Sequence, residues 1–201
     1  MVQLLLASNN KGKLVEMQSL LADTSFQLLL LQDLGVRLEV EESGLTYAEN
    51  AALKAGAGAT ASGLITLADD SGLEVAALGG RPGLYSARYS QTPGASDADR
   101  RAFLLQELNL HERPWFARFR CTVAIATPAG ELYFSEGECS GEIIPEERGE
   151  NGFGYDPIFF ISHLGRTMAE LSTEEKNRIS HRAMAMQNAR CILTELITSK
   201  R

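Results

Sequence analysis

Short apolar segments alternate with longer amphipathic segments along this chain. Residues 2–7 and 64–68 are short and almost wholly apolar, a pattern typical of buried strands. After the first of them, apolar residues recur at helical spacing from Lys13 onward, at Leu14, Met17, Leu20 and Leu21. The chain therefore opens with the strand–helix alternation of α/β proteins.

Capping signals predict three further helical regions. Thr46 and Glu49 form a capping box that opens an alanine-rich helix reaching about Ala61, and Gly63 ends it. Ser96-Asp97-Ala98-Asp99 starts a helix to about Asn109, and Ser172-Thr173-Glu174-Glu175 caps a largely helical tail over residues 174–198. The alanine-rich helix carries a small-residue face suited to close packing, formed by Ala48, Ala51, Ala52, Ala55 and Ala59.

The remaining segments indicate strands and loops. Residues 26–31 and 36–40 are predicted as a second strand and its continuation, and residues 157–161 as another strand. Residues 116–126 alternate apolar and polar positions, and after the turn signal Pro128-Ala129-Gly130 residues 131–144 return as an antiparallel partner. Residues 79–95 and 146–154 are predicted as loops. We therefore expect an α/β fold with a mixed sheet.

Composition narrows the class of protein. Apolar residues make up 44% of the 201 residues and charged residues 22%, which is ordinary for a soluble globular domain. The formal charge of −7 argues against binding of duplex nucleic acid, but a few local cations suffice for a small anionic ligand. Three widely spaced cysteines support neither a disulfide framework nor a zinc cluster. With no signal peptide and no long apolar run, we expect a cytoplasmic protein without a membrane span.

The first candidate site is the polar turn between the first strand and the first helix. Its residues are Ser8, Asn9, Asn10, Lys11, Gly12 and Lys13. A strand that leads through a polar turn into a helix directs unpaired backbone N–H groups at whatever lies there, and the two lysines add positive charge. The turn lacks the features of a Walker A loop and of a dinucleotide fingerprint. It is either a phosphate cradle or an ordinary turn.

The second candidate site is acidic. Asp69 and Asp70 follow an apolar strand, at the place where open α/β sheets bind ligands, and alternation along the strand lets only one of them face a cleft easily. Carboxylate oxygens suit Mg²⁺, which takes one or two of them together with phosphate oxygens. Asp-Ser-Gly also forms simple turns. Glu41 and Glu42 are a second acidic pair, either metal ligands or a solvated charged run.

Two clusters near the C-terminal end complete the set. Gly152-Phe153-Gly154-Tyr155-Asp156-Pro157 combines two flexible glycines with aromatic rings that suit a flat ligand, although a long hairpin loop has the same composition. Lys176 and Ser180 share a helix face in the predicted tail, with His181 and Arg182 adjacent. Most runs of this kind are solvated helix faces.

The order of these motifs resembles one known family. Six motifs in this order resemble those of the Ham1-like inosine/xanthosine triphosphate pyrophosphatases. They are the turn at residues 8–13, Glu41 to Asn50, Ala68-Asp69-Asp70-Ser71-Gly72-Leu73, Pro82 to Arg88, the Gly-Phe-Gly-Tyr-Asp-Pro segment and Ser180-His181-Arg182. The resemblance extends over nearly the whole chain. Glu150-Asn151 is a local departure at a place where the family varies.

The resemblance implies a fold, an activity and a set of roles. It implies one pyrophosphatase domain over residues 1–201, with an elongated mixed sheet and flanking helices forming two lobes around a cleft, in a homodimer. It implies Mg²⁺-dependent hydrolysis of dITP, ITP or XTP to the monophosphate and pyrophosphate, with no nucleic-acid or membrane partner. Asp70 would be the proton acceptor and a metal ligand, and Glu41 would be the second acidic ligand, with its neighbour Glu42 as the alternative. The substrate would contact residues 8–13, Ser71, Phe153, Gly154, Tyr155, Asp156, Lys176, His181 and Arg182.

Base selection follows from the purine edge. Donors from His181, Arg182 or nearby backbone would meet a 6-keto oxygen, with Phe153 or Tyr155 packing on the ring. Adenine carries an amino donor at that position, and a buried mismatch of this kind reaches discrimination on the order of 10⁴-fold. How GTP is rejected stays open.

Two alternative functions are distinguishable from this one. Maf-like nucleotide pyrophosphatases share the broad fold and act on other bases, so a comparison of substrates separates them. A nucleotide-sensing binding protein would use its acidic pairs structurally, and the presence of both Asp70 and Glu41-Glu42 disfavours it.

Overall fold

A computed structural model describes residues 2–198. Its strands are β1 (Val2–Leu6), β2 (Phe26–Leu30), β3 (Ile65–Val75), β4 (Trp115–Ala126), β5 (Leu132–Ile143), β6 (Phe159–Ile161) and β7 (Arg166–Thr167). The α-helices are α1 (Lys11–Leu21), α2 (Tyr47–Ser62), α3 (Asp97–Leu108), α4 (Thr173–Ile179) and α5 (His181–Thr198). Short 3₁₀ helices are η1 (Leu31–Leu34), η2 (Ala76–Leu78), η3 (Gly83–Arg88), η4 (Asp156–Ile158) and η5 (Met168–Glu170).

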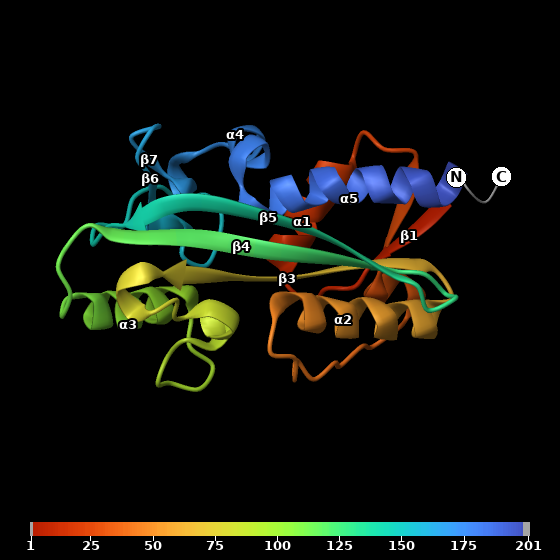
Figure 1. The fold of residues 1–201 in the computed structure, drawn as a ribbon, viewed down its shortest axis with the longest axis horizontal. Helices are drawn as coiled ribbons and strands as arrows, with labels where there is room; N and C mark the ends of the chain where they lie inside the picture. Colours follow the sequence, from red (N-terminus) through yellow and green to blue (C-terminus); the bar gives the residue numbers. More distant parts are fainter. Residues whose placement is uncertain (1, 199–201) are drawn as a thin grey trace. The chain divides into compact units, whose positions relative to one another are not determined.

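The strands form one mixed sheet in the order β2-β1-β3-β4-β5-β6-β7. β1 pairs in parallel with both β2 and β3, with Leu4 opposite Leu28 on one side and Ile65 on the other. β6 pairs antiparallel with β5 and with β7. The predicted α/β class with a mixed sheet and flanking helices is therefore confirmed (Figure 1).

The chain divides into two compact units, each assembled from separate stretches of sequence. The first unit holds the described residues within Met1–Asp70, Cys121–Gly137 and His181–Arg201. The second holds Ser71–Arg120 and Glu138–Ser180. The unit boundaries fall inside β3, β4 and β5, so each of these long strands contributes to both.

Helices cover both faces of the sheet in the first unit. Helices α1 and α5 lie on one face, where Met17 and Met186 pack against Leu4, Leu67 and Val123 (Figure 1). Helix α2 lies on the other face and packs through an almost purely alanine core. That core comprises Ala51, Ala55 and Ala59 from the helix with Ala7, Ala68, Ala124 and Ala126 from the strands and their ends. Three alanines of the predicted small-residue face therefore make the close contact, whereas Ala48 and Ala52 are only partly buried.

The second unit has its own apolar core. Leu104 and Leu108 of α3 pack with Leu73 and Trp115 of the strands and with Phe159. The predicted helix start at Ser96 is confirmed, and Ser96 and Asp99 form a capping box there by exchanging hydrogen bonds. Each unit therefore has an apolar core of its own.

Several predicted boundaries differ from the structure. Residues 36–40 do not continue β2, because Gly35 ends η1 in the left-handed conformation and turns the chain out of line with the strand. The strand after Gly63 does not end before the aspartates. β3 runs to Val75, because cations within the fold pair with Asp69 and Asp70 and allow both to lie mid-strand.

The helical tail is also interrupted. Ser180 has extended backbone angles (φ −70°, ψ 151°), so α4 ends before it and α5 begins at His181. Lys176 and Ser180 therefore do not share a helix face as predicted, and His181 belongs to the next helix. The predicted loop over residues 79–95 likewise contains η3. Within residues 2–198, none of the helices is long and apolar enough to cross a membrane.

Candidate active site

The polar turn at residues 8–13 is built around the start of α1. Asn10 is the N-cap, and its side-chain oxygen accepts a hydrogen bond from the Lys13 N–H at 3.1 Å. The Ser8 hydroxyl accepts one from the Asn10 N–H at 3.2 Å. Lys11 and Gly12 therefore belong to the first helical turn, whose backbone donors have no partner within the helix. Such a helix start favours an anion.

Asp69 anchors a buried cluster of charges beneath that turn. Its Oδ2 lies 3.1 Å from Lys13 Nζ and accepts hydrogen bonds from Arg182 Nε and Nη2, each at 3.1 Å. The remaining arm of the guanidinium donates to Glu16 of α1. Strand β3 and helices α1 and α5 thus meet at one carboxylate.

The electrostatics of this cluster favour the charged forms. Burial disfavours the ionised carboxylate, but the charges of Lys13 and Arg182 outweigh it and hold the pKa of Asp69 well below its ordinary value. Burial likewise opposes the charge of Arg182, while Asp69 and Glu16 raise its pKa. Arg182 is 1% exposed, so its guanidinium serves the protein's interior.

Asp70 faces the opposite side of the sheet, toward α2. Its Oδ2 accepts a hydrogen bond from Asn50 Nδ2 at 3.2 Å, and its Oδ1 lies 3.6 Å from Lys54 Nζ. The same ammonium lies 2.8 Å from Glu42 Oε1. Asp70 and Glu42 therefore meet at one cation, whereas Glu41 is exposed.

The pKa of Asp70 shifts in the direction opposite to that of Asp69. Burial raises it, and the charges of Lys54 and Lys13 offset this only in part. A carboxylate with a raised pKa suits the acceptance of a proton. Burial acts against the charge of Lys54, but the carboxylates of Asp70, Asp69 and Glu42 together raise its pKa.

The donor set at Asp70 and Glu42 fits a hard divalent cation. Within residues 2–198, no three or more His, Cys, Asp or Glu side chains gather where they would hold a metal. Mg²⁺ does not need such a cage, because one or two carboxylates with water and substrate phosphates suffice. That an ammonium already lies between the two carboxylates indicates that their charges converge on a cationic position.

The second unit carries a different cluster around Asp156. This buried carboxylate accepts hydrogen bonds at Oδ2 from Lys176 Nζ at 2.5 Å and from the Phe153 N–H at 2.9 Å. The Lys176 ammonium also lies 5.1 Å from the centre of the Phe153 ring. Gly152 has φ +76°, and a Cβ there would lie 2.1 Å from Asp156 Oδ2, so only glycine allows this turn.

Hydrogen bonds tie the neighbouring residues Gly154 and Tyr155 to other parts of the second unit. Tyr155 is buried, and its hydroxyl donates to the Ser86 carbonyl at 2.9 Å. Ser86 in turn accepts from the Leu73 N–H at 2.8 Å, which ties the Pro82-to-Arg88 motif to β3. The Gly154 N–H donates to Asp97 Oδ2 at 2.7 Å. Phe153 is half-buried and is the aromatic side chain of the segment with an accessible ring.

The structure therefore sorts the predicted residues into groups. In the first unit it brings Lys13, Asp69 and Arg182 together, with His181 buried at the start of α5, and places Asp70 on the opposite sheet face. In the second unit it joins Phe153, Asp156 and Lys176, and Ser71 begins that unit's part of β3.

Sequence reasoning missed three polar partners. Asn50 and Lys54 are four residues apart on α2, the spacing that places two side chains on one helix face. They are two of the few polar side chains on an alanine-rich helix, which is the signal that points to them. Glu16 follows Lys13 by one turn of α1, but nothing in its local pattern predicts burial.

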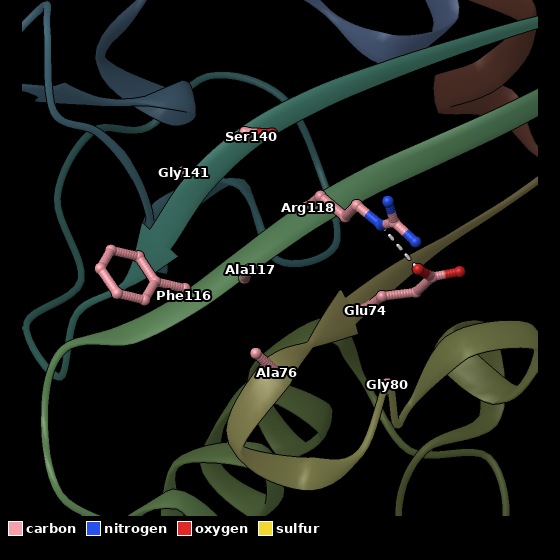
Figure 2. Close-up of a pocket in the computed structure, with 8 residues that line it drawn as sticks. All are labelled: Glu74, Ala76, Gly80, Phe116, Ala117, Arg118, Ser140 and Gly141. Atoms are coloured by element: carbon pink, nitrogen blue, oxygen red, sulfur yellow. Dashed lines mark hydrogen bonds and ion pairs between the residues drawn. The ribbon is translucent and has the colours of Figure 1, made fainter.

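A separate pocket lies on the second unit. Figure 2 shows it between β3, β4 and β5, where Arg118 Nε donates to Glu74 Oε2 at 2.8 Å and the Phe116 ring stands exposed. Its volume is about 460 Å³. Among the described residues that line it, none belongs to the predicted nucleotide site.

The chain is similar to a known family and to several known proteins over most of its length. The profile of the Ham1 family matches residues 4–191. A dITP/XTP pyrophosphatase from Geobacter sulfurreducens is 50% identical over 189 residues, 92% of this chain and 94% of that protein. One from Desulforamulus reducens is 45% identical over 97% of both. A solved Ham1 protein from Coxiella burnetii superposes with a TM-score of 0.87 at 42% identity, covering 97% of this chain and 100% of that one.

Proposed function

The chain belongs to the Ham1 family, and we propose that it hydrolyses the non-standard purine nucleoside triphosphates dITP, ITP and XTP to the monophosphate and pyrophosphate. The observation that carries this proposal is Asp70. It is a buried carboxylate with a raised pKa on strand β3. The neighbouring residue of this strand, Asp69, pairs with Lys13 at the start of α1. Relatives named dITP/XTP pyrophosphatase match nearly the whole chain.

Asp70 acts as the general base in this proposal. Its Oδ2 accepts a hydrogen bond from Asn50 at 3.2 Å, which orients the carboxylate. A water held beside it loses a proton to the carboxylate and attacks the α-phosphorus, and the bond to the pyrophosphate leaving group breaks. The raised pKa brings the base closer to neutral pH, where proton acceptance is most effective.

The start of α1 supplies the positive environment for the phosphates. Backbone N–H groups of the first turn and the ammonium of Lys13 donate to phosphate oxygens. Lys13 is oriented by Asp69 at 3.1 Å, which reduces the entropy lost when the side chain binds an anion. These donors stabilise the charge that develops on the leaving pyrophosphate.

Mg²⁺ is the proposed cofactor, and Asp70 with Glu42 would hold it. When bound, the ion supplies charge neutralisation on the triphosphate. Glu42 takes precedence over Glu41 because its carboxylate already converges with Asp70 on one cationic position, while Glu41 is exposed.

For the purine, we propose Phe153 as the packing surface and Lys176 as a donor to the 6-keto oxygen. Tyr155 supports them from the core rather than contacting the base. Arg182 supports the site through Asp69 and Glu16, and His181 stays a candidate for base recognition. We also propose that the protein is cytoplasmic and forms a homodimer. Light scattering tests the dimer, for which we expect a mass near twice the 21.9 kDa of one chain.

The general-base assignment is tested with Asp70→Asn. Because asparagine keeps the shape but accepts no proton, we expect the rate of pyrophosphate release from dITP to fall by about 10²–10⁴-fold. The exposed Asp23→Asn is the matched control and should retain the wild-type rate. Asp70→Asn with full activity would remove Asp70 from the chemistry.

The metal ligand is tested with a second matched pair. Glu42→Gln should raise the Mg²⁺ concentration needed for half-maximal activity by roughly 10-fold or more, because a neutral amide binds Mg²⁺ more weakly than a carboxylate. The exposed Glu41→Gln should leave this concentration nearly unchanged. The reverse ranking would assign the site to Glu41.

A further inference from the structure

Lys54 holds an unusual position on α2. Its side chain is 16% exposed, and it projects from a helix that packs against the sheet mainly through alanines. Its ammonium lies 2.8 Å from Glu42 Oε1 and 3.6 Å from Asp70 Oδ1. These are the same two carboxylates that the proposed function assigns to the metal. Lys54 therefore lies where a metal's charge is needed.

Both oxygens of Asp70 face donors of the protein. Oδ1 faces the Lys54 ammonium and Oδ2 accepts from Asn50 at 3.2 Å. A divalent ion that takes Asp70 and Glu42 as ligands must displace the ammonium from them, since two cations cannot share the same oxygens without strong repulsion. Metal binding and the Lys54 ion pairs are thus alternatives.

We propose that Lys54 is an internal counter-ion that keeps the metal ligands in place and makes divalent-metal binding depend on the nucleotide. Without substrate, the ammonium competes with the metal for Glu42 and Asp70, so the protein binds the metal weakly. A triphosphate gives the displaced ammonium other anionic oxygens, so the competition ends when nucleotide and metal arrive together. This inference rests on the proposed function and adds to it a residue that couples two ligands.

Two features distinguish this role from that of a simple structural ion pair. If the Lys54 ion pairs were only structural, they would stabilise the fold. Breaking them would then leave the metal affinity unchanged or lower it. A competing counter-ion has the opposite effect, because its removal frees two carboxylates for the metal. Linkage also requires that nucleotide and metal strengthen each other's binding by the same factor, and that this factor shrink when Lys54 loses its charge.

The test measures Mn²⁺ binding, by electron paramagnetic resonance of the free ion, in wild type and in Lys54→Met. Methionine retains an apolar stem of similar length and removes the charge. Without nucleotide, we expect Lys54→Met to bind Mn²⁺ at least tenfold more tightly than wild type. With a non-hydrolysable α,β-imido dITP present, the gain in Mn²⁺ affinity caused by the nucleotide should be at least tenfold smaller in the variant.

Controls separate the outcomes. Arg37→Met removes one exposed positive charge and should change Mn²⁺ affinity by less than twofold, which excludes a general effect of net charge. If Lys54→Met does not fold, as judged by circular dichroism, Lys54→Gln serves with the same expectation. Unchanged or weaker Mn²⁺ binding in the folded Lys54 variant would overturn the inference.

Failure of the proposed metal site has a different signature. If Asp70→Asn leaves Mn²⁺ affinity in the presence of the dITP analogue unchanged, then Asp70 is not a ligand, and the proposed function loses its metal site. If Asp70→Asn weakens that affinity while Lys54→Met fails to tighten binding without nucleotide, the metal site stands and only the role of Lys54 is rejected.

Discussion

At the residue scale, two neighbouring aspartates of β3 illustrate how position decides chemistry. Asp69 and Asp70 are adjacent in sequence, but strand alternation directs them to opposite sheet faces. One meets Lys13 and Arg182 and has a lowered pKa, while the other meets Asn50 and Lys54 and has a raised pKa. The first pairs with cations inside the fold, and the second is the base in the proposed function.

Their stabilities should differ accordingly. Asp69→Asn leaves the buried Arg182 and Lys13 short of a counter-charge, so we expect a loss of about 3–5 kcal/mol in the free energy of unfolding, measured with urea. At pH 7 and without metal, Asp70→Asn should be neutral or stabilising by up to about 1 kcal/mol, because it removes a carboxylate whose ionisation burial disfavours. Equal losses in both variants would contradict this division.

The pH dependence has a definite sign. Because the folded-state pKa of Asp69 lies below its unfolded value, its contribution to stability is present above the ordinary aspartate value of 3.8 and is lost as the pH falls through the folded-state value. For Asp70 the pKa is raised, so its contribution is present below 3.8 and is lost as the pH rises. Wild type should lose stability on acidification more steeply than Asp69→Asn does.

At the scale of elements, helix α2 contains a matched pair of glycines. A Cβ on Gly58 would lie 2.7 Å from Thr66 Cγ2 and 3.2 Å from the Ala7 Cβ, whereas a Cβ on Gly56 would meet nothing within 4 Å. Gly58→Ala should therefore destabilise the protein by about 1–3 kcal/mol through overpacking. Gly56→Ala should stabilise it by about 0.5–1 kcal/mol through helix propensity.

Thermal or urea unfolding of both glycine variants measures these effects. If the Gly58→Ala variant were as stable as the Gly56→Ala variant, this result would contradict the tight alanine-rich packing of α2 against the strands. The position of Asn50 and Lys54 depends on that contact, because α2 carries both toward Asp70.

Local signals predicted some elements well and others poorly. The helices α2 and α3 were predictable because Thr46 and Ser96 cap them in ways that depend on a few neighbouring residues. The full length of β3 was not, because its central aspartates look like a strand end until Lys13, Arg182 and Lys54 arrive from distant parts of the chain. The break at Ser180 was missed because the helical pattern continues on both sides of it.

The candidate site follows the same rule. The proposed roles of Asp70 and of the turn at residues 8–13 follow from motif order, but the proposal of Glu42 rather than Glu41 as metal ligand depends on the position of Lys54. The interior positions of Tyr155 and Arg182 likewise depend on partners far away in sequence, at Ser86 and Asp69.

At the scale of the whole molecule, the acidic balance of the chain and an anionic substrate are compatible. The formal charge is −7, but positive charge collects at the start of α1 and at Lys54 within the first unit, and at Lys176 within the second. Each of these cations is positioned by carboxylates. Binding of a triphosphate therefore depends on local arrangement rather than on net charge.

The most direct test of the account is pyrophosphate release from dITP, XTP, dGTP and dATP, each with Mg²⁺ and with a chelator. Hydrolysis should be fast for dITP and XTP, at least about 100-fold slower for dATP because its 6-amino group presents a donor to a donor, and abolished by the chelator. Equal turnover of dATP and dITP would contradict the proposed selectivity, and undiminished release in the chelator would contradict the metal.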